Sequence, residues 1–214
     1  HTRSDRDWSS DVCSSDLKFG NENSDLEFSN LAFSPDGKVL AMVYDSELLL
    51  WEVGNWNREP NQFRFNEDNE VDSFAISHDS NQIAIGYRSF PYEIELYAFP
   101  EIDSDQPIRT FAGHASAVGA LDFSPDGRWL ASGSNMPRVG IWDLESPNGQ
   151  VELFEGHQAF IWQVDFSPDS RYVLSASDDN TIRVWDVLNL DQESQLLEGH
   201  TTFVWAAEFS PDGN

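Results

Sequence analysis

Residues 156–186 read GHQAFIWQVDFSPDSRYVLSASDDNTIRVWD, and this stretch decides the fold because its parts recur along the chain. A weaker copy of one of its words, Ile-Ser-His-Asp, begins at Ile76, and the full word Phe-Ser-Pro-Asp begins at Phe33, Phe123, Phe166 and Phe209. Successive copies lie 43, 47, 43 and 43 residues apart. A fixed period of this kind indicates one structural unit repeated side by side.

The spacing of apolar residues within each repeat predicts its local structure. A regular strand buries every second residue, but here the apolar residues fall at i, i+3 and i+5, which predicts a β-bulge after the first of them. The Ser-Pro-Asp-Gly that follows predicts a tight turn, because proline presets φ and glycine accepts the left-handed position. The apolar anchors are Phe28, Leu31, Phe33; Val71, Phe74, Ile76; Val118, Leu121, Phe123; Ile161, Val164, Phe166; and Val204, Ala207, Phe209.

Further strands are expected after this turn in each repeat. Four strands per repeat at this period predict an all-β fold, a β-propeller of four-stranded antiparallel blades. We expect it to be incomplete, with about four blades plus the opening strand of a fifth. The expected second strands are Trp129–Ser134 and Tyr172–Ser177, and the expected fourth strands are Ile108–Phe111, Val151–Phe154 and Gln195–Leu197. The repeats lie near 24–66, 67–112, 113–155, 156–198 and 199–214, the last one truncated.

Two further words, Gly-His and Trp-Asp, make the chain resemble the WD-repeat family over about residues 24–214. The spacing from His114 to Trp142 is 28 residues, and the next repeat has the same spacing. In this family a histidine, a second-strand serine, a turn aspartate and the third-strand tryptophan form a buried hydrogen-bonded chain. The resemblance therefore assigns a complete chain to His157, Ser175, Asp179 and Trp185.

The other repeats depart from the family pattern. The third has His114, Ser132 and Trp142, but it has Met136 where the family has aspartate. We therefore expect some other group to satisfy His114. The two N-terminal repeats lack Gly-His, and the second has Tyr97 in place of tryptophan. The family most often closes with seven blades, so the resemblance implies further blades beyond this sequence.

The N-terminal residues 1–17 do not share the repeat pattern. Back-translation of residues 7–17, DWSSDVCSSDL, yields bases that look like a common short-read sequencing adapter. We interpret residues 1–17 as translated adapter sequence or a disordered leader and assign the propeller fragment to residues 18–214. The one cysteine, Cys13, lies in this leader, so we expect neither disulfides nor thiol chemistry in the propeller.

Composition excludes several classes of partner. The formal net charge is −26, from 12 basic and 38 acidic residues. An acidic surface repels phosphate groups, which argues against nucleic acid and anionic lipid. No run approaches the roughly 18 apolar residues of a membrane helix, so we expect no membrane insertion in this segment. We expect a soluble protein and favour the cytoplasm.

Two patterns of chemical residues have a structural explanation. The histidines of the Gly-His words, His114, His157 and His200, recur once per repeat without cysteines or a close histidine pair, so we expect no metal site. Ser175, His157 and Asp179 have the composition of a hydrolytic triad, but the family buries these positions. We therefore expect no catalytic residues and no cofactor.

Aromatic residues near the expected bulges are the candidates for partner binding. Phe160 and Trp162 flank one anchor, Phe203 and Trp205 flank the next, and Asp178 lies on the following turn. In the family this region faces the top rim, where partners bind, and aromatic residues are enriched in interface hot spots. The alternative is that these rings pack between blades or line the central channel. The preceding repeat has the small residues Ala117 and Gly119 there, so the patch is expected to end at that blade.

The expected function is that of a non-catalytic scaffold that binds a protein or peptide through the propeller rim. The alternative is an accessory or gating propeller of a larger enzyme, such as a peptidase or kinase fusion, or of a periplasmic assembly. Those propellers usually lack Gly-His and Trp-Asp, which favours the scaffold. The step from fold to function is an analogy.

Overall fold

The computed structural model describes residues 28–44, 47–65, 70–146, 151–189 and 191–213, so the leader at residues 1–17 lies outside the described part. All regular secondary structure in the described part is β-strand, arranged in four four-stranded sheets. In every sheet each strand pairs antiparallel with the next one in the sequence. The predicted all-β fold of four-stranded antiparallel blades is confirmed.

Each blade is one repeat of the sequence. The first blade contains β1 (Phe28–Phe33), β2 (Val39–Tyr44), β3 (Glu47–Glu52) and β4 (Asn61–Phe63). The second contains β5 (Val71–Ile76), β6 (Gln82–Tyr87), β7 (Ile94–Ala98) and β8 (Arg109–Phe111). The third contains β9 (Val118–Phe123), β10 (Trp129–Ser134), β11 (Arg138–Asp143) and β12 (Val151–Glu155). The fourth contains β13 (Ile161–Phe166), β14 (Tyr172–Ser177), β15 (Ile182–Asp186) and β16 (Gln195–Leu197).

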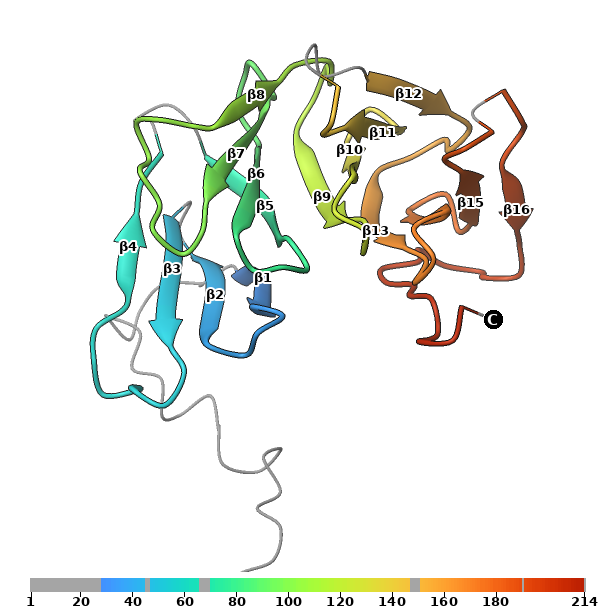
Figure 1. Ribbon diagram of the computed structural model, residues 1–214. Helices are drawn as coiled ribbons and strands as arrows, with labels where there is room; N and C mark the ends of the chain where they lie inside the picture. Colours follow the sequence, from blue (N-terminus) through green and yellow to red (C-terminus); the bar gives the residue numbers. More distant parts are fainter. Residues whose placement is uncertain (1–27, 45–46, 66–69, 147–150, 190, 214) are drawn as a thin grey trace, which may run out of the picture.

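The first strand of each blade is the innermost one. Strand β9 packs against both β5 and β13, and β1 packs against β5. The four blades therefore follow one another around a common centre in chain order, as Figure 1 shows. This arrangement brings equivalent positions of consecutive repeats side by side along the inner strands.

A β-bulge interrupts the inner strand of every blade. The pairing register shifts between Phe28 and Asn30 in the first blade, between Val71 and Ser73 in the second, and between Ile161 and Gln163 in the fourth. In the third blade Gly133 pairs with Ala120 but Ser134 pairs with Val118, which leaves Gly119 unpaired. The unpaired residue in each case follows the first apolar anchor, as the i, i+3 and i+5 spacing predicts. The bulged residues of the second, third and fourth blades are Asp72, Gly119 and Trp162.

Hydrophobic clusters fill the boundaries between consecutive blades. One joins the first and second blades, with Val43 and Leu48 packed near Phe74 and Ile83. A second joins the second and third blades, and a third joins the third and fourth. Each blade therefore buries the inner-strand anchors of the next one, and the core lies between sheets rather than within them.

The anchors of β1 are an exception to this burial. Phe33 is 57% exposed and Leu31 is 61% exposed, whereas the equivalent Phe123 and Leu121 are 1% and 9% exposed. Among the described strands β1 packs against β2 and against β5 of the second blade, and this packing leaves more than half of the Leu31 and Phe33 side chains exposed. The apolar pattern is the same in both repeats, but the burial is not.

The fifth repeat differs from the expectation of an opening strand. Residues 203–209 form no strand, because no second strand of that repeat lies beside them in the described residues. They are nevertheless held against the fourth blade. Val204 N donates to Ser177 O at 3.1 Å, and Phe209 N donates to Asp165 Oδ2 at 2.7 Å.

The turn after each inner strand is built by its own serine and aspartate. Ser124 Oγ donates to Asp126 Oδ1 at 2.6 Å and accepts from Trp129 N at 2.8 Å. The left-handed position of this turn is Gly127, with φ 75°, but the fourth blade has Ser170 there, with φ 62°. Ser170 Oγ accepts from Asp126 N of the third blade at 3.0 Å. A hydrogen bond between blades thus offsets the cost of a side chain at a positive φ.

Candidate functional site

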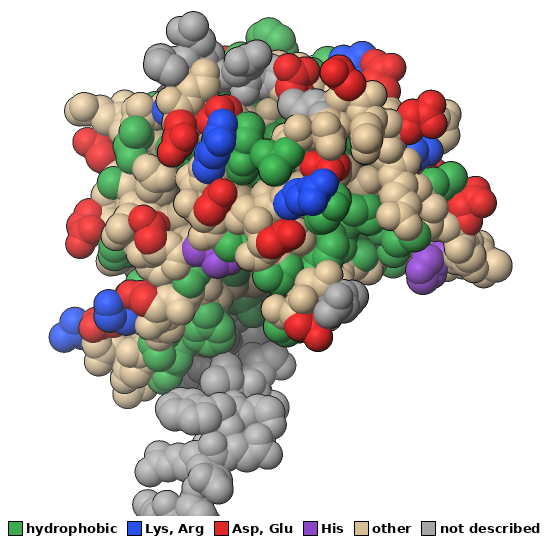
Figure 2. Space-filling model, turned by 45° about the vertical axis from the view of Figure 1, so that its right-hand side comes forward, with side chains coloured by type: hydrophobic (Ala, Val, Ile, Leu, Met, Phe, Trp, Pro, Cys, Tyr) green, Lys and Arg blue, Asp and Glu red, His purple; other side chains and the backbone are tan. Residues whose placement is uncertain are grey.

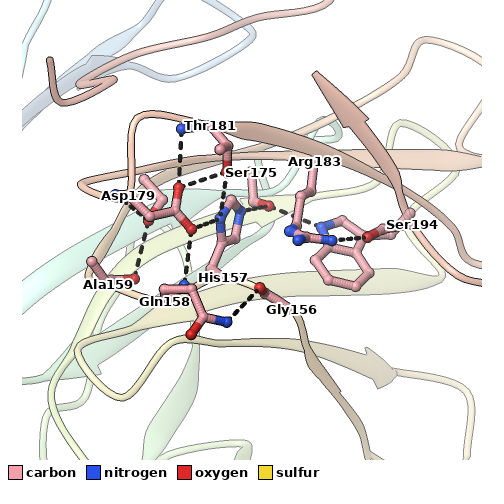
Figure 3. Close-up of polar contacts among 11 residues, drawn as sticks. Gly156, His157, Gln158, Ala159, Ser175, Asp179, Thr181, Arg183 and Ser194 are labelled. Atoms are coloured by element: carbon pink, nitrogen blue, oxygen red, sulfur yellow. Dashed lines mark hydrogen bonds and ion pairs between the residues drawn. The ribbon is translucent and has the colours of Figure 1, made fainter. Parts of the chain in front are cut away.

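The fourth blade contains a continuous hydrogen-bonded chain of buried side chains, shown in Figure 3. His157 Nδ1 lies 2.9 Å from Asp179 Oδ2, and His157 Nε2 lies 2.7 Å from Ser175 Oγ. Trp185 Nε1 donates to the same Ser175 oxygen at 2.9 Å. The four residues that the resemblance assigns are therefore hydrogen-bonded in series. Trp185 lies on β15, Ser175 on β14, His157 in the Gly-His segment and Asp179 in the β14–β15 turn.

The aspartate of this chain joins the β14–β15 turn to the Gly-His segment. Asp179 Oδ2 accepts from Gln158 N at 2.8 Å, and Asp179 Oδ1 accepts from Thr181 N at 3.0 Å and from Thr181 Oγ1 at 2.5 Å. Burial acts to raise the pKa of Asp179, but the hydrogen bonds from Thr181, Gln158 and His157 outweigh it and hold the pKa at about 2. The carboxylate is therefore charged and fully engaged at neutral pH.

The histidine of the chain is neutral, which determines its proton arrangement. Burial lowers the pKa of His157, and the hydrogen bond to Asp179 opposes this only in part. With Nδ1–H donated to Asp179, Nε2 must accept the Ser175 hydroxyl proton, and the Ser175 oxygen accepts the indole N–H of Trp185. Ser175 is 0% exposed and His157 is 3% exposed, so this Ser–His–Asp set has no path to a substrate. Its geometry supports a structural role.

The third blade has only part of this chain. His114 Nε2 lies 2.7 Å from Ser132 Oγ, which accepts from Trp142 Nε1 at 2.8 Å. His114 Nδ1 is buried and has no hydrogen-bond partner among the described residues, so none of these replaces the missing aspartate, and which group satisfies His114 stays a prediction. Met136, at the aspartate position, is 47% exposed. Burial, with a contribution from Arg138, lowers the pKa of His114 to about 4.

Replacing the aspartate of the complete chain should cost stability. We expect Asp179→Ala to lower the free energy of unfolding by about 1–3 kcal/mol, because it leaves the buried His157 N–H without an acceptor. Urea unfolding followed by tryptophan fluorescence measures this change.

The equivalent position in the third blade supplies the matched control. Met136→Ala should change stability by about 0.5 kcal/mol or less, because that side chain is half exposed and has no hydrogen-bonding role. Met136→Asp is the reverse test, since a carboxylate there can accept from His114 Nδ1 and should raise stability. A neutral Asp179→Ala combined with a severe Met136→Ala would show that the hydrogen-bonded chain has been assigned wrongly.

The second blade has a different polar cluster, which sequence reasoning missed. Tyr97 takes the position of the tryptophan, and its hydroxyl donates to Glu95 at 2.6 Å. The hydroxyl of Tyr87 donates to the same carboxylate oxygen, and Phe65 packs against Tyr97 at 5.1 Å between ring centroids. Burial raises the pKa of both tyrosines, so they remain protonated donors. The sequence places Glu95 and Tyr97 two residues apart, on the same face of a strand. No pattern in the sequence indicates that Tyr87 lies beside them.

The rim candidates of the fourth and fifth repeats form an aromatic stack. The rings of Phe160 and Trp162 lie 4.3 Å apart edge to face, and those of Trp162 and Trp205 lie 4.8 Å apart at an interplanar angle of 24°. Trp162 Nε1 donates to Asp178, which orients the indole. Trp162 is 36% exposed and Trp205 is 64% exposed. Phe203 is also exposed, but it has no ring contact with the stack among the described residues.

The small residue at the next bulge makes room for this stack. A Cβ atom on Gly119 would lie 2.7 Å from the ring of Phe160, so only glycine allows the ring to rest there. The ring of Phe160 therefore lies against the bulge of the third blade, and Asp72 Oδ2 lies 3.6 Å from the position of the same Cβ. That the patch ends at this blade stays a prediction.

The described residues contain no group of three or more His, Cys, Asp or Glu side chains placed to hold a metal ion. The third histidine of the repeated word, His200, is exposed. No helix in the described part of the chain is long and apolar enough to cross a lipid bilayer.

Comparison with solved structures supports the fold. A chain in the crystal structure of a mitotic checkpoint complex superimposes with a TM-score of 0.72 and 22% identity, over 85% of this chain and 52% of that one. The structure of U3-55K superimposes with a TM-score of 0.70 and 24% identity, over 85% of this chain and 55% of that one. At these identities the likeness concerns the fold alone.

Comparison with protein families and curated proteins gives the relationship. Target of rapamycin complex subunit wat1 of Schizosaccharomyces pombe is 30% identical over 125 residues, which are 56% of this chain and 37% of that protein. Target of rapamycin complex subunit LST8-1 of Arabidopsis thaliana is 30% identical over 109 residues, which are 51% of this chain and 34% of that protein. The chain thus spans about a third of the length of these relatives. The model of the family "WD domain, G-beta repeat" matches residues 105–143, 148–186 and 191–214. These successive matches, on blades whose bulges and turns repeat in register, show that residues 105–214 contain repeats of the WD-repeat family.

Proposed function

We propose that this protein is a scaffold that binds a protein or peptide partner through an aromatic patch on its rim. The patch consists of Phe160, Trp162 and Trp205, with Phe203 and Asp178 beside them. The observation that carries the proposal is the exposed Trp162–Trp205 stack, because two large rings exposed to water in van der Waals contact offer apolar area that a partner can cover.

The patch is also rigid before a partner arrives. Asp178 N donates to Phe160 O at 3.0 Å, Val204 N donates to Ser177 O, and the Trp162 indole is tied to Asp178. Side chains already held in place lose little conformational entropy on binding, so more of the burial energy appears as affinity. The two target of rapamycin relatives are named as subunits of complexes, which supports a scaffold role for this chain as well.

Truncating the patch should weaken partner capture while leaving the fold intact. We expect Trp162→Ala combined with Trp205→Ala to lower affinity by about 2 kcal/mol or more, which is roughly thirtyfold, because central aromatic anchors contribute on this scale. The measurement is affinity capture by the full-length protein from a lysate of its source cells, quantified by mass spectrometry.

An exposed aromatic residue outside the patch supplies the control. Phe90 is 80% exposed on the loop between β6 and β7, and Phe90→Ala should leave capture unchanged. Thermal unfolding of each variant separates binding from folding. Unchanged capture by the double tryptophan variant would refute the patch, and loss of capture together with a large drop in Tm would identify the rings as core.

A further inference from the structure

We propose that the third blade contains a binding site for a carboxylate that comes from outside the chain, with His114 Nδ1–H and Ala115 N–H as its two donors. The site is separate from the aromatic patch and does not depend on it. Three features of the described residues support it: the equivalent donors bind a carboxylate in the fourth blade, the third blade presents the same pair without an acceptor, and the pair lies at the rim.

The fourth blade shows how this pair of donors binds a carboxylate. His157 Nδ1 and Gln158 N converge on one oxygen, Asp179 Oδ2, at 2.9 and 2.8 Å, as Figure 3 shows. Burial acts to raise the pKa of Asp179, but the hydrogen bonds from Thr181, Gln158 and His157 outweigh it and hold the pKa at about 2. Donors in this arrangement therefore favour a charged oxygen over a neutral one.

The third blade orients its histidine in the same way. His114 Nε2 lies 2.7 Å from Ser132 Oγ, the distance that His157 Nε2 keeps from its own serine. Ser132 Oγ accepts from Trp142 Nε1 at 2.8 Å. The hydroxyl proton goes either to His114 Nε2 or to Gly140 O, which lies 3.5 Å away. The shorter contact is the stronger one, so Nε2 accepts, the imidazole proton lies on Nδ1, and Nδ1 is a donor.

Both donors of the third blade are without an acceptor in the part of the chain that the structure describes. His114 is 7% exposed, and its Nδ1 is buried with no partner there. Ala115 N takes the position of Gln158 N, and no described residue accepts from it. A buried N–H without an acceptor destabilises the fold, so an oxygen that reaches it binds favourably.

The two donors lie close to the surface of the rim. Ala115 is exposed, and Met136, at the aspartate position, is 47% exposed. Met136 follows its histidine by 22 residues, as Asp179 does in the fourth blade, so its side chain begins at the same place. A methionine side chain has three rotatable bonds and can move aside for a ligand, whereas an aspartate there would fill the site itself.

The charges around the site tolerate an anion. Burial lowers the pKa of His114 to about 4, and the guanidinium of Arg138 adds to this fall, which shows that its positive charge acts on the imidazole. Arg138 Nη2 also donates to Glu155 Oε1 at 2.6 Å, so the two N–H groups select the ligand more than net charge does. Acidic side chains are spread widely over the face shown in Figure 2, but at physiological salt charges more than about 8 Å away are largely screened.

The test is a titration of the chain with sodium formate, the smallest carboxylate, followed by proton–nitrogen NMR at physiological salt. We expect formate to move the Ala115 amide and the His114 Nδ1–H signals downfield, with half-saturation at about 5–50 mM, because a ligand of so few atoms binds weakly. Sodium chloride at the same concentrations should not move them. The signals of His157 and Gln158 are the control inside the molecule, since Asp179 already occupies both donors.

Met136→Asp is the matched variant, because it places a carboxylate at the site within the chain. Its Ala115 and His114 signals should lie downfield before formate is added and should move little further in formate. Met136→Leu, which keeps the size and apolar character of the side chain, should respond as the wild type does. The proposal is overturned if formate and chloride cause equal shifts, if formate causes none, or if Met136→Asp responds as strongly as the wild type.

The capture assay then distinguishes two sources of the carboxylate. If the ligand is an acidic side chain of the protein partner, Met136→Asp should lower partner capture at least about fivefold, because two carboxylates compete for the same donors and repel each other. If the ligand is a small free carboxylate, capture should be unchanged while the formate response persists. The double tryptophan variant tests the aromatic patch separately, so failure of the patch and failure of the carboxylate site give different results.

Discussion

Phe166→Ala is expected to lower the free energy of unfolding by about 3–5 kcal/mol, while Phe33→Ala changes it by about 1 kcal/mol or less. Both phenylalanines open the same Phe-Ser-Pro-Asp word and end an inner strand. Phe166 is 5% exposed in the cluster between the third and fourth blades, so its truncation leaves a cavity there. Phe33 is 57% exposed, so water already covers most of the ring.

Urea unfolding of the two variants beside the wild type measures both changes, provided that the slope of free energy against urea is the same in all three proteins. Matching losses in the two variants would mean that the β1 anchors are covered after all, for instance by association of two chains through Leu31 and Phe33. An exposed apolar strand invites such association, so the comparison is made at several protein concentrations.

Asp122→Asn is expected to stabilise the protein at pH 8 by about 2–4 kcal/mol and to have little effect near pH 4. Asp122 Oδ2 accepts from Phe166 N at 2.7 Å, which joins the third blade to the fourth, and an amide oxygen can accept the same bond. Burial raises the pKa of Asp122 from 3.8 to about 7, the hydrogen bond from Phe166 acts in the opposite direction, and the negative charge of Asp165 adds to the rise. Ionised Asp122 is therefore a cost of the folded state.

The sign of the pH dependence follows from proton binding. Below about pH 4 this carboxyl group is protonated in both states, so the wild type carries no penalty. Between about pH 4 and pH 7 the unfolded chain loses the proton more readily than the folded one, so the free energy of unfolding falls as pH rises and then levels off. Each tenfold difference in proton affinity corresponds to about 1.4 kcal/mol, so a pKa raised from 3.8 to about 7 limits the stabilisation by Asp122→Asn to about 4 kcal/mol. Screening of the charge by solvent lowers this stabilisation toward about 2 kcal/mol.

The measurement is urea unfolding of the wild type and Asp122→Asn at pH 4 and pH 8. The difference between the two proteins is the informative quantity, because every other ionisable group, including the nearby Asp165 with its raised pKa, is present in both. If the free energies of unfolding of the two proteins differ by the same amount at both pH values, ionisation of Asp122 does not destabilise the folded state.

Much of the local architecture could be predicted from the sequence because it depends on short-range physics. The extra residue between Ile161 and Val164 requires a bulge wherever that strand pairs, since a β-strand alternates its faces regardless of its neighbours. The serine and aspartate of each Phe-Ser-Pro-Asp word close their own turn two residues apart. The resemblance to the family also assigned His157, Ser175, Asp179 and Trp185, and the structure shows the hydrogen bonds that join them.

The remaining features depend on atoms that are distant in the sequence, and tertiary structure decides them. A repeated word cannot reveal that Phe33 is more than half exposed while Phe166 is buried, because burial depends on the neighbouring blade. Nor can it reveal that His114 Nδ1 has no partner among the described residues, or that Tyr87 and Tyr97 share Glu95. The sequence by itself determined the blades and their bulges, through backbone sterics and alternation. The contact of Trp162 with Trp205 was decided by the packing of consecutive repeats. This packing brings two residues that are 43 positions apart in the sequence so close that their ring centroids lie 4.8 Å apart.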